Sequence, residues 1–149
     1  MNMQAMHSDE RFEFTVNGPY ERVFPLFGAW GERAWAEGWN PRFIWPHPAA
    51  DRPGMVFTQD NEGQAATWVN TDFDSESGRV QYVYVLPEVL ATIVTLQVER
   101  LGEGTHVRVR YERTALSAQA ESRVQRMARS DRDAGPEWAG AIHAYLDRD

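Results

Sequence analysis

Few residues of this chain have the types and spacing that enzyme chemistry usually requires. The chain contains no cysteine and no lysine, so neither a thiolate nucleophile nor a lysine Schiff base can form. Four histidines stand at positions 7, 47, 106 and 143, and none belongs to a His-x-His or HExxH pattern. Neither a GxSxG nucleophile elbow nor a glycine-rich phosphate loop occurs. We therefore expect no metal site, no cofactor and no dedicated catalytic residue.

Two weaker polar patterns remain as candidates for chemistry. Asp72 and Asp74 suggest a carboxylate pair, but they lead into the turn-forming segment Ser75–Gly78, which favours a solvated turn. His47 and His143 have the side-chain type of a general base near neutral pH, although a solvated or structural role is the simpler explanation. Neither pattern specifies a reaction.

Arg113 gives a more specific signal. The alternation of apolar side chains from Val107 to Tyr111 continues to Arg113 and places it on the apolar face of a strand. A buried guanidinium needs a partner, because an unpaired buried charge is costly. That partner could be a ligand carboxylate bound through two hydrogen bonds, or Asp131 in the helical segment that follows. Alternatively, the strand ends before Arg113 and its side chain points to water.

The elements that position these residues follow a simple order. Alternating phenylalanines predict a first strand over Arg11–Val16, after a loose leader at residues 1–9. Two short helices are expected over Tyr20–Phe27 and Glu32–Glu37. Short connections rich in turn formers favour antiparallel hairpins for the strands that come next. These strands are expected over Arg42–Pro46, Met55–Gln59, Gln64–Phe73, Arg79–Leu86, Val89–Leu101 and Thr105–Ala115.

A helical period returns in the last part of the chain. From Ser117 to Leu146 the apolar residues share one stripe, which predicts a long C-terminal helix. The dipeptide Gly135-Pro136 interrupts this stripe, so we expect a kink or a break near Asp133.

Length and charge limit the classes of function. With 149 residues, the chain is expected to form a single domain, 1–149, with its own core. The net charge of −7 argues against nucleic-acid binding, which needs a basic surface. The longest apolar tract, Val80–Val98, is interrupted by Pro87 and Glu88, so no membrane-spanning segment is expected. The N-terminus lacks the apolar core of a signal peptide, and we expect a cytoplasmic protein.

This order of elements resembles the helix-grip fold of the START-like (SRPBCC) superfamily, which includes pollen-allergen-like, polyketide cyclase and lipid-transfer proteins. The resemblance is carried by NGPYERVFPLFGAW after the first strand, by TWVNTDFDSESGRVQYVYV in the middle and by EWAGAIHAYLD near the end, and it spans Arg11–Leu146. It implies an α+β fold in which a curved antiparallel sheet of six to seven strands, two short helices and a long C-terminal helix enclose a hydrophobic cavity. In family members this cavity accepts lipids, polyketides, hormones or other apolar molecules.

The aromatic residues are suited to such a cavity. Tryptophan is seldom fully buried and its indole N–H needs a partner, so several indoles around one hollow fit a pocket lining, although they could equally fill a solid core. Polar side chains on the same strands would orient the ligand. The residues that we expect to contact a ligand are Trp35, Trp39, Trp45, Trp68, Asn70, Tyr82, Tyr84, Tyr111, Arg113 and Trp138.

Three hypotheses follow for the function. The first is binding of one hydrophobic or amphipathic small molecule of the lipid, polyketide or aromatic type. The second is a cyclase or hydratase that uses the same cavity, with His47, Tyr84 or Arg113 moving a proton or stabilising an enolate. The third is a protein-interaction module, such as a domain that resembles chaperone ATPase activators, which needs a large exposed apolar patch. The sequence leaves a homodimer open.

Overall fold

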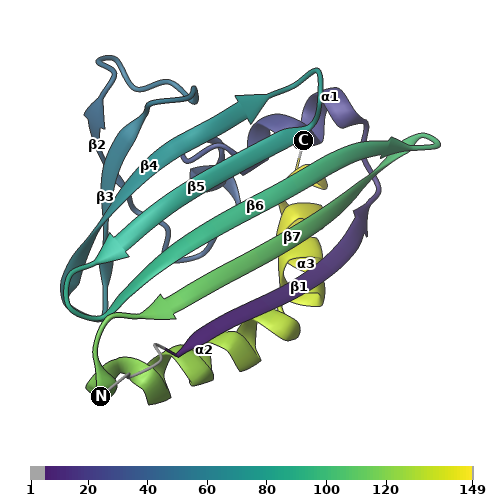
Figure 1. The fold of residues 1–149 in the computed structure, drawn as a ribbon. Helices are drawn as coiled ribbons and strands as arrows, with labels where there is room; N and C mark the ends of the chain where they lie inside the picture. The colour runs from purple at the N-terminus through teal and green to yellow at the C-terminus, as the bar shows by residue number, and fades with distance from the viewer. Residues whose placement is uncertain (1–5, 149) are drawn as a thin grey trace.

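The computed structural model describes residues 6–148, and these fold as one antiparallel sheet with helices on one side (Figure 1). Each strand pairs with the next one along the chain, except that β1 closes the sheet against β7, so the order is β1-β7-β6-β5-β4-β3-β2. The predicted α+β helix-grip architecture is confirmed. The strands are β1 His7–Val16, β2 Arg42–Trp45, β3 Val56–Asn61, β4 Gln64–Asp74, β5 Arg79–Leu86, β6 Leu90–Leu101 and β7 Gly104–Ala115.

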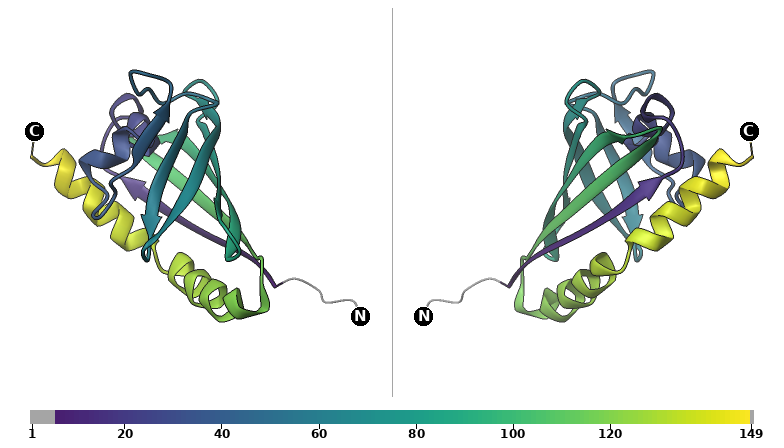
Figure 2. Two further views of the ribbon diagram at one scale, coloured as in Figure 1. Left: turned by 90° about the vertical axis from the view of Figure 1, so that its left-hand side faces the viewer. Right: turned by 90° about the vertical axis from the view of Figure 1, so that its right-hand side faces the viewer.

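The helices fall into two groups. Short segments between β1 and β2 cover one end of the sheet: α1 Tyr20–Val23, η1 Phe24–Phe27 and η2 Gly31–Ala34. After β7 come η3 Ala118–Ala120, α2 Glu121–Arg132 and α3 Gly135–Leu146. Figure 2 shows α2 and α3 on the same side of the sheet, with a change of direction between them. The break at Asp133 and Ala134 agrees with the expected interruption before Pro136, whose ring cannot continue a helix without a new first turn.

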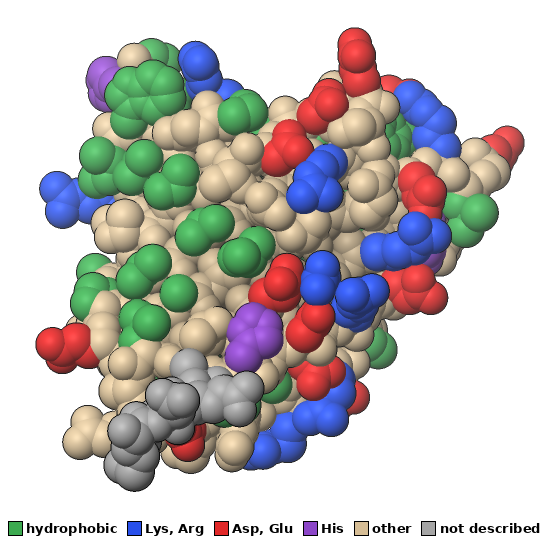
Figure 3. Space-filling model, viewed as in Figure 1, with side chains coloured by type: hydrophobic (Ala, Val, Ile, Leu, Met, Phe, Trp, Pro, Cys, Tyr) green, Lys and Arg blue, Asp and Glu red, His purple; other side chains and the backbone are tan. Residues whose placement is uncertain are grey.

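The two faces of the sheet differ as the alternation predicts. On β6 and β7 the inward residues Val94, Leu96, Val107 and Val109 are almost completely buried. On the outward face, charged side chains gather over β7 and β1, as in the pair between Arg110 and Asp9, while apolar ones gather over β4 and β5 (Figure 3). The sheet also bends at register shifts in β2 and β4, which are typical of bulges and help it to curve around the helices.

Most of the expected bounds agree with the structure to within two residues, but two elements differ more. β1 begins at His7, inside the stretch expected to be a loose leader, because it pairs with β7 along its full length and the His7 ring bonds to the Thr114 hydroxyl at 2.8 Å. Residues 1–5 of that expected leader lie outside the described part of the chain. The expected helix over Glu32–Glu37 is only the 3-10 turn η2. The chain leaves the helical conformation at Trp35, where the indole N–H donates to the Leu26 carbonyl at 2.7 Å.

Candidate functional site

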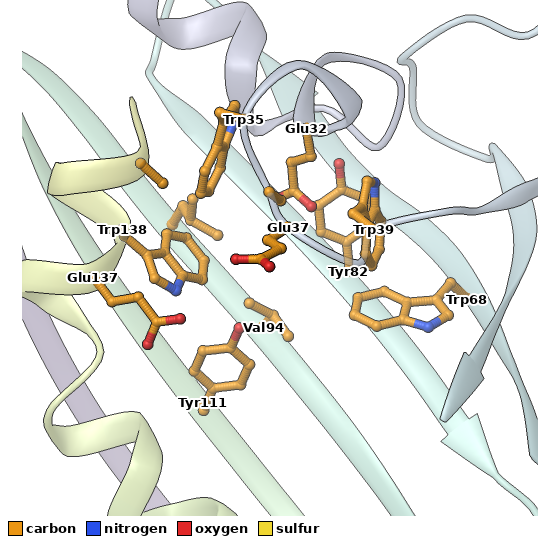
Figure 4. Close-up of a pocket in the computed structure, with 13 residues that line it drawn as sticks. Glu32, Trp35, Glu37, Trp39, Trp68, Tyr82, Val94, Tyr111, Glu137 and Trp138 are labelled. Carbon is orange, nitrogen blue, oxygen red and sulfur yellow. The ribbon is translucent and has the colours of Figure 1, made fainter. Parts of the chain in front are cut away.

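A cavity of about 270 Å³ lies between the concave face of the sheet and the first turns of α3, with η2 and the residues after it as its third side (Figure 4). Figure 4 shows the indoles of Trp35 and Trp138 on one side of the space and those of Trp39 and Trp68 on the other. Its lining comprises four indoles, two phenols, three carboxyl groups and four small or aliphatic side chains: Trp35, Trp39, Trp68, Trp138, Tyr82, Tyr111, Glu32, Glu37, Glu137, Ala36, Ala141, Val94 and Leu96.

The aromatic walls are held in place by their own polar atoms and by one another. The indole N–H groups of Trp35 and Trp39 donate to the carbonyls of Leu26 and Ala29 at 2.7 and 2.9 Å, which leaves the ring faces free to line the space. The ring centroids of Trp35 and Trp138 lie 5.5 Å apart, and those of Trp39 and Trp68 lie 5.4 Å apart. These separations are within the range of favourable aromatic pairs, so the two rings of each wall pack against each other.

The floor of the cavity comes from the sheet. The Tyr82 hydroxyl donates to the Phe27 carbonyl at 2.9 Å, so it faces the η1 segment. The Tyr111 hydroxyl points into the cavity (Figure 4). Burial raises the pKa of Tyr111, although the nearby Arg113 guanidinium lowers it, so this hydroxyl keeps its proton and can donate a hydrogen bond.

Three carboxyl groups give the cavity an acidic character. Glu37 and Glu137 are exposed at its edge, whereas Glu32 is half-buried on the side of the cavity formed by η2. This burial raises the pKa of Glu32 well above its usual value, and the neighbouring Asp51 carboxylate raises it further. The protein therefore raises the pKa of the Glu32 carboxyl and favours its protonated form.

The segment that carries Glu32 has a defined shape because of Asp51. The Asp51 carboxylate accepts hydrogen bonds from the backbone N–H groups of Trp30 at 2.9 Å and Gly31 at 3.2 Å, at the start of η2. A Cβ atom at Gly31 would lie 2.0 Å from the Pro25 carbonyl oxygen, so glycine is required where the chain turns into η2. These contacts fix the direction in which η2 presents Glu32 to the cavity.

No family model matches the sequence, and no curated protein matches it. Solved structures match over nearly the whole chain. An uncharacterized protein from Rhizobium leguminosarum has a TM-score of 0.68 at 18% identity, with 98% of each chain covered. Ara h 8.0201 has a TM-score of 0.66 at 13% identity, covering 97% of this chain and 100% of that one. Truncated norcoclaurine synthase from Thalictrum flavum has a TM-score of 0.72 at 10% identity, covering 98% and 97%.

The chain shares its helix-grip fold with these solved structures. The resemblance expected from the sequence is thus confirmed for the fold. Sequence identities of 10–18% show a shared fold and nothing further. Within residues 6–148, no helix is both long enough and apolar enough to cross a bilayer. In the same part of the chain, no three or more His, Cys, Asp or Glu side chains are grouped as metal ligands.

Six of the ten residues expected to contact a ligand line this cavity: Trp35, Trp39, Trp68, Tyr82, Tyr111 and Trp138. The other four lie apart from it. Trp45 is 48% exposed on β2, where the Arg52 guanidinium lies 5.1 Å from its ring centroid. Asn70 is fully buried on β4, and its amide atoms have no hydrogen-bond partner of good geometry within residues 6–148. Tyr84 and Arg113 belong to a separate buried cluster.

That cluster shows which partner Arg113 uses in this structure. Its Nε and Nη2 atoms donate to the two carboxylate oxygens of Asp131, both at 2.8 Å, and its Nη1 donates to the Tyr84 hydroxyl at 2.5 Å. Burial is the largest single effect and opposes the charge of Arg113, but the hydrogen bonds to Asp131 and the electrostatic attraction of Tyr84, Asp131 and Tyr111 together outweigh it and raise the pKa of Arg113. Of the three alternatives left open by the sequence, the structure therefore contains the pair with Asp131.

The acidic lining was not expected from the sequence. Glu32 stands three residues before Trp35, and Glu137 directly precedes Trp138, so each carboxyl accompanies a tryptophan that was already a candidate. This proximity is the one signal by which the glutamates could have been found. Nothing local distinguishes them from the exposed acidic residues elsewhere in the chain.

The buried Glu32 carboxyl predicts a pH dependence of stability. Its pKa is higher in the folded chain than its usual 4.5, so the folded state binds the proton more tightly. The free energy of unfolding should therefore fall as the pH rises from about 4.5 toward the raised folded pKa. In Glu32→Gln this decline should be much smaller, as measured by urea unfolding at pH 5 and pH 8. Parallel declines in the variant and in the unchanged protein would show that Glu32 does not cause the effect.

Proposed function

We propose that this chain binds one aromatic or otherwise apolar small molecule in the cavity between the sheet and α3. The observation that carries the proposal is an open space of about 270 Å³ with four indole faces around it, which the side chains of residues 6–148 leave unfilled. Cavities lined mostly by aromatic and aliphatic groups, with a few polar groups, are typical ligand sites. Burial of a ligand ring against these walls would contribute roughly 25 cal/mol per Å² of apolar surface.

A solved structure with the same fold supports this proposal. Norcoclaurine synthase from Thalictrum flavum, with a TM-score of 0.70 at 12% identity, has been determined in complex with dopamine and hydroxybenzaldehyde. Both are single-ring aromatic molecules. The proposed ligand of the present chain has the same general size and shape, and the aromatic walls of its cavity would pack against such a ring.

Ala141→Phe tests the proposal by filling the cavity without removing any existing group. Ala141 lines the cavity, whereas Ala144 is exposed on the same helix, so Ala144→Phe is a matched control. We expect the neutral fluorescent probe N-phenyl-1-naphthylamine to bind the unchanged protein and Ala144→Phe equally. Its affinity for Ala141→Phe should fall by about tenfold or more, which corresponds to a loss of about 1.4 kcal/mol. If the probe binds Ala141→Phe and Ala144→Phe with equal affinity, it binds outside the cavity, and the proposal is contradicted.

A second candidate function rests on the Glu32 carboxyl. A carboxyl group with a raised pKa that faces a ligand cavity has the properties of a general acid or base, as a cyclase or hydratase requires. The side chains of His47, Tyr84 and Arg113 do not line the cavity, so among the described residues Glu32 is the better candidate for this role. Loss of turnover in Glu32→Gln, with ligand affinity retained, would favour the enzyme over the simple binding protein.

A further inference from the structure

The charged side chains that line the cavity are all acidic. Its described lining contains three carboxyl groups, from Glu32, Glu37 and Glu137, and no arginine or histidine. The chain holds fifteen cationic side chains, so this absence does not follow from a shortage of arginine. A ligand that enters the cavity therefore meets acidic groups without any countercharge from the lining.

The Glu32 carboxyl has no hydrogen-bond or ion-pair partner in the described part of the chain. Among residues 6–148 it makes neither a hydrogen bond nor an ion pair, whereas the carboxylates of Asp9, Asp72 and Asp131 each pair with an arginine. The charged or titratable groups that face Glu32 are Asp51 from the loop before β3, Tyr82 from β5 and Tyr111 from β7. None of these three carries a positive charge.

Arg33, which follows Glu32 in the sequence, and Arg113, which contacts the cavity-lining Tyr111, have other partners. The Arg33 guanidinium lies 3.3 Å from the Trp30 ring centroid, and its Nε donates to the Trp30 carbonyl at 2.9 Å. Arg113 lies behind the Tyr111 ring, 4.4 Å from its centroid, and its charge is already matched by Asp131. Within residues 6–148, no cationic side chain therefore pairs with Glu32.

The aromatic walls also favour a positively charged ligand. A cation over the face of an indole or phenol ring is attracted by the negative face of the ring, and the attraction grows when water is excluded. The cavity presents the indoles of Trp35, Trp39, Trp68 and Trp138 and the phenol of Tyr111 around one space that also holds carboxyl groups. Rings and carboxyl groups together select for positive charge, and the rings alone also accept an apolar body.

From these contacts we infer that the ligand of this cavity is an organic cation, an ammonium group attached to an aromatic or other apolar body. The inference rests on the proposed binding function and specifies its ligand class. The ammonium group pairs with the Glu32 carboxylate while the apolar body packs between the indoles. Fatty acids and other carboxylate ligands are disfavoured, because their charge would face three glutamates without a countercharge.

Binding of a cation also has a proton linkage. Burial raises the pKa of Glu32 in the free protein. A bound cation stabilises the ionised form of Glu32 and therefore lowers this pKa, so binding releases a proton. The affinity for a cation whose own charge is fixed should therefore rise with pH and level off once Glu32 is ionised in the free protein.

A pair of isosteric probes tests the inference. Benzyltrimethylammonium carries a fixed positive charge at every pH, and neopentylbenzene has the same shape without the charge. At pH 8 we expect the cation to bind at least about tenfold more tightly than the hydrocarbon. At pH 6 the affinity for the cation should be lower than at pH 8. Both affinities are measured by titration calorimetry. Glu32→Gln should remove most of this preference and leave the affinity for neopentylbenzene unchanged.

Two further variants complete the design. Glu103→Gln, in the exposed turn between β6 and β7, should bind both probes like the unchanged protein. Glu137→Gln changes an exposed residue at the cavity edge, so it tests the acidic lining without touching a buried group, and we expect a smaller loss that affects the cation alone. If neopentylbenzene binds as tightly as the cation, or more tightly, the charge inference is wrong and the binding function stands. If neither probe binds, both are wrong.

Discussion

Replacement of Asp131 by alanine is expected to lower the free energy of unfolding by about 3–5 kcal/mol. Asp131 and Arg113 are only 6% and 5% exposed, and two hydrogen bonds of 2.8 Å join them. The variant leaves the Arg113 guanidinium buried with only the hydroxyls of Tyr84 and Thr92 beside it, so most of its desolvation is uncompensated. Urea unfolding at neutral pH measures the loss.

A surface pair of similar geometry is the control. Arg110 donates to the two carboxylate oxygens of Asp9 at 2.9 and 2.7 Å, but both side chains are more than a third exposed. Asp9→Ala should therefore cost only about 0–1 kcal/mol, because water solvates the arginine that remains. Losses of the same size in Asp9→Ala and Asp131→Ala would mean that burial does not govern the strength of these pairs.

Trp68→Ala is expected to lower the free energy of unfolding by about 3–5 kcal/mol. The Trp68 ring stacks on Tyr84 with a centroid distance of 4.1 Å and on Phe57 at 5.5 Å, and its edge meets Trp39 and Tyr82. Removal of the ring enlarges the cavity and takes away partners from four aromatic side chains at once. The loss is measured by urea unfolding, and the variant is therefore a poor probe of ligand binding alone.

Trp45→Ala is the matched control for this prediction. The Trp45 ring is 48% exposed on the edge strand β2, so its removal should change stability by no more than about 0.5 kcal/mol. A comparable loss in the two variants would contradict the packing role assigned to Trp68. Trp68→Phe, which keeps a stacked ring and removes a buried indole N–H without a partner in the described structure, should cost less than Trp68→Ala.

Much of the fold could be predicted from the sequence because it depends on local patterns. The alternation in Leu90–Leu101 and Thr105–Ala115 identified the two longest strands almost to the residue, since one face of each is buried. The same alternation placed Arg113 on the buried face, where the structure has it. Gly135-Pro136 marked the break between α2 and α3, because proline stops one helix and suits the start of the next.

The cavity could be predicted only in part, because it depends on long-range contacts. The sequence offers no periodicity that tells the exposed Trp45 from the cavity-lining Trp39, six residues earlier. Their difference arises from the hydrogen bond between the Trp39 indole and the Ala29 carbonyl, ten residues away. The role of Glu32 likewise depends on Asp51, which shapes η2 from a loop nineteen positions later in the chain.

Binding of a small molecule in the cavity can be observed through the six indole N–H groups of the chain. Trp35, Trp39, Trp68 and Trp138 line the cavity, whereas Trp30 and Trp45 are exposed elsewhere. In a ¹H–¹⁵N correlation spectrum, titration with benzyltrimethylammonium or N-phenyl-1-naphthylamine should shift the indole signals of the four lining residues and leave the other two in place. Unchanged lining signals at saturating ligand, or shifts confined to Trp30 and Trp45, would contradict the account.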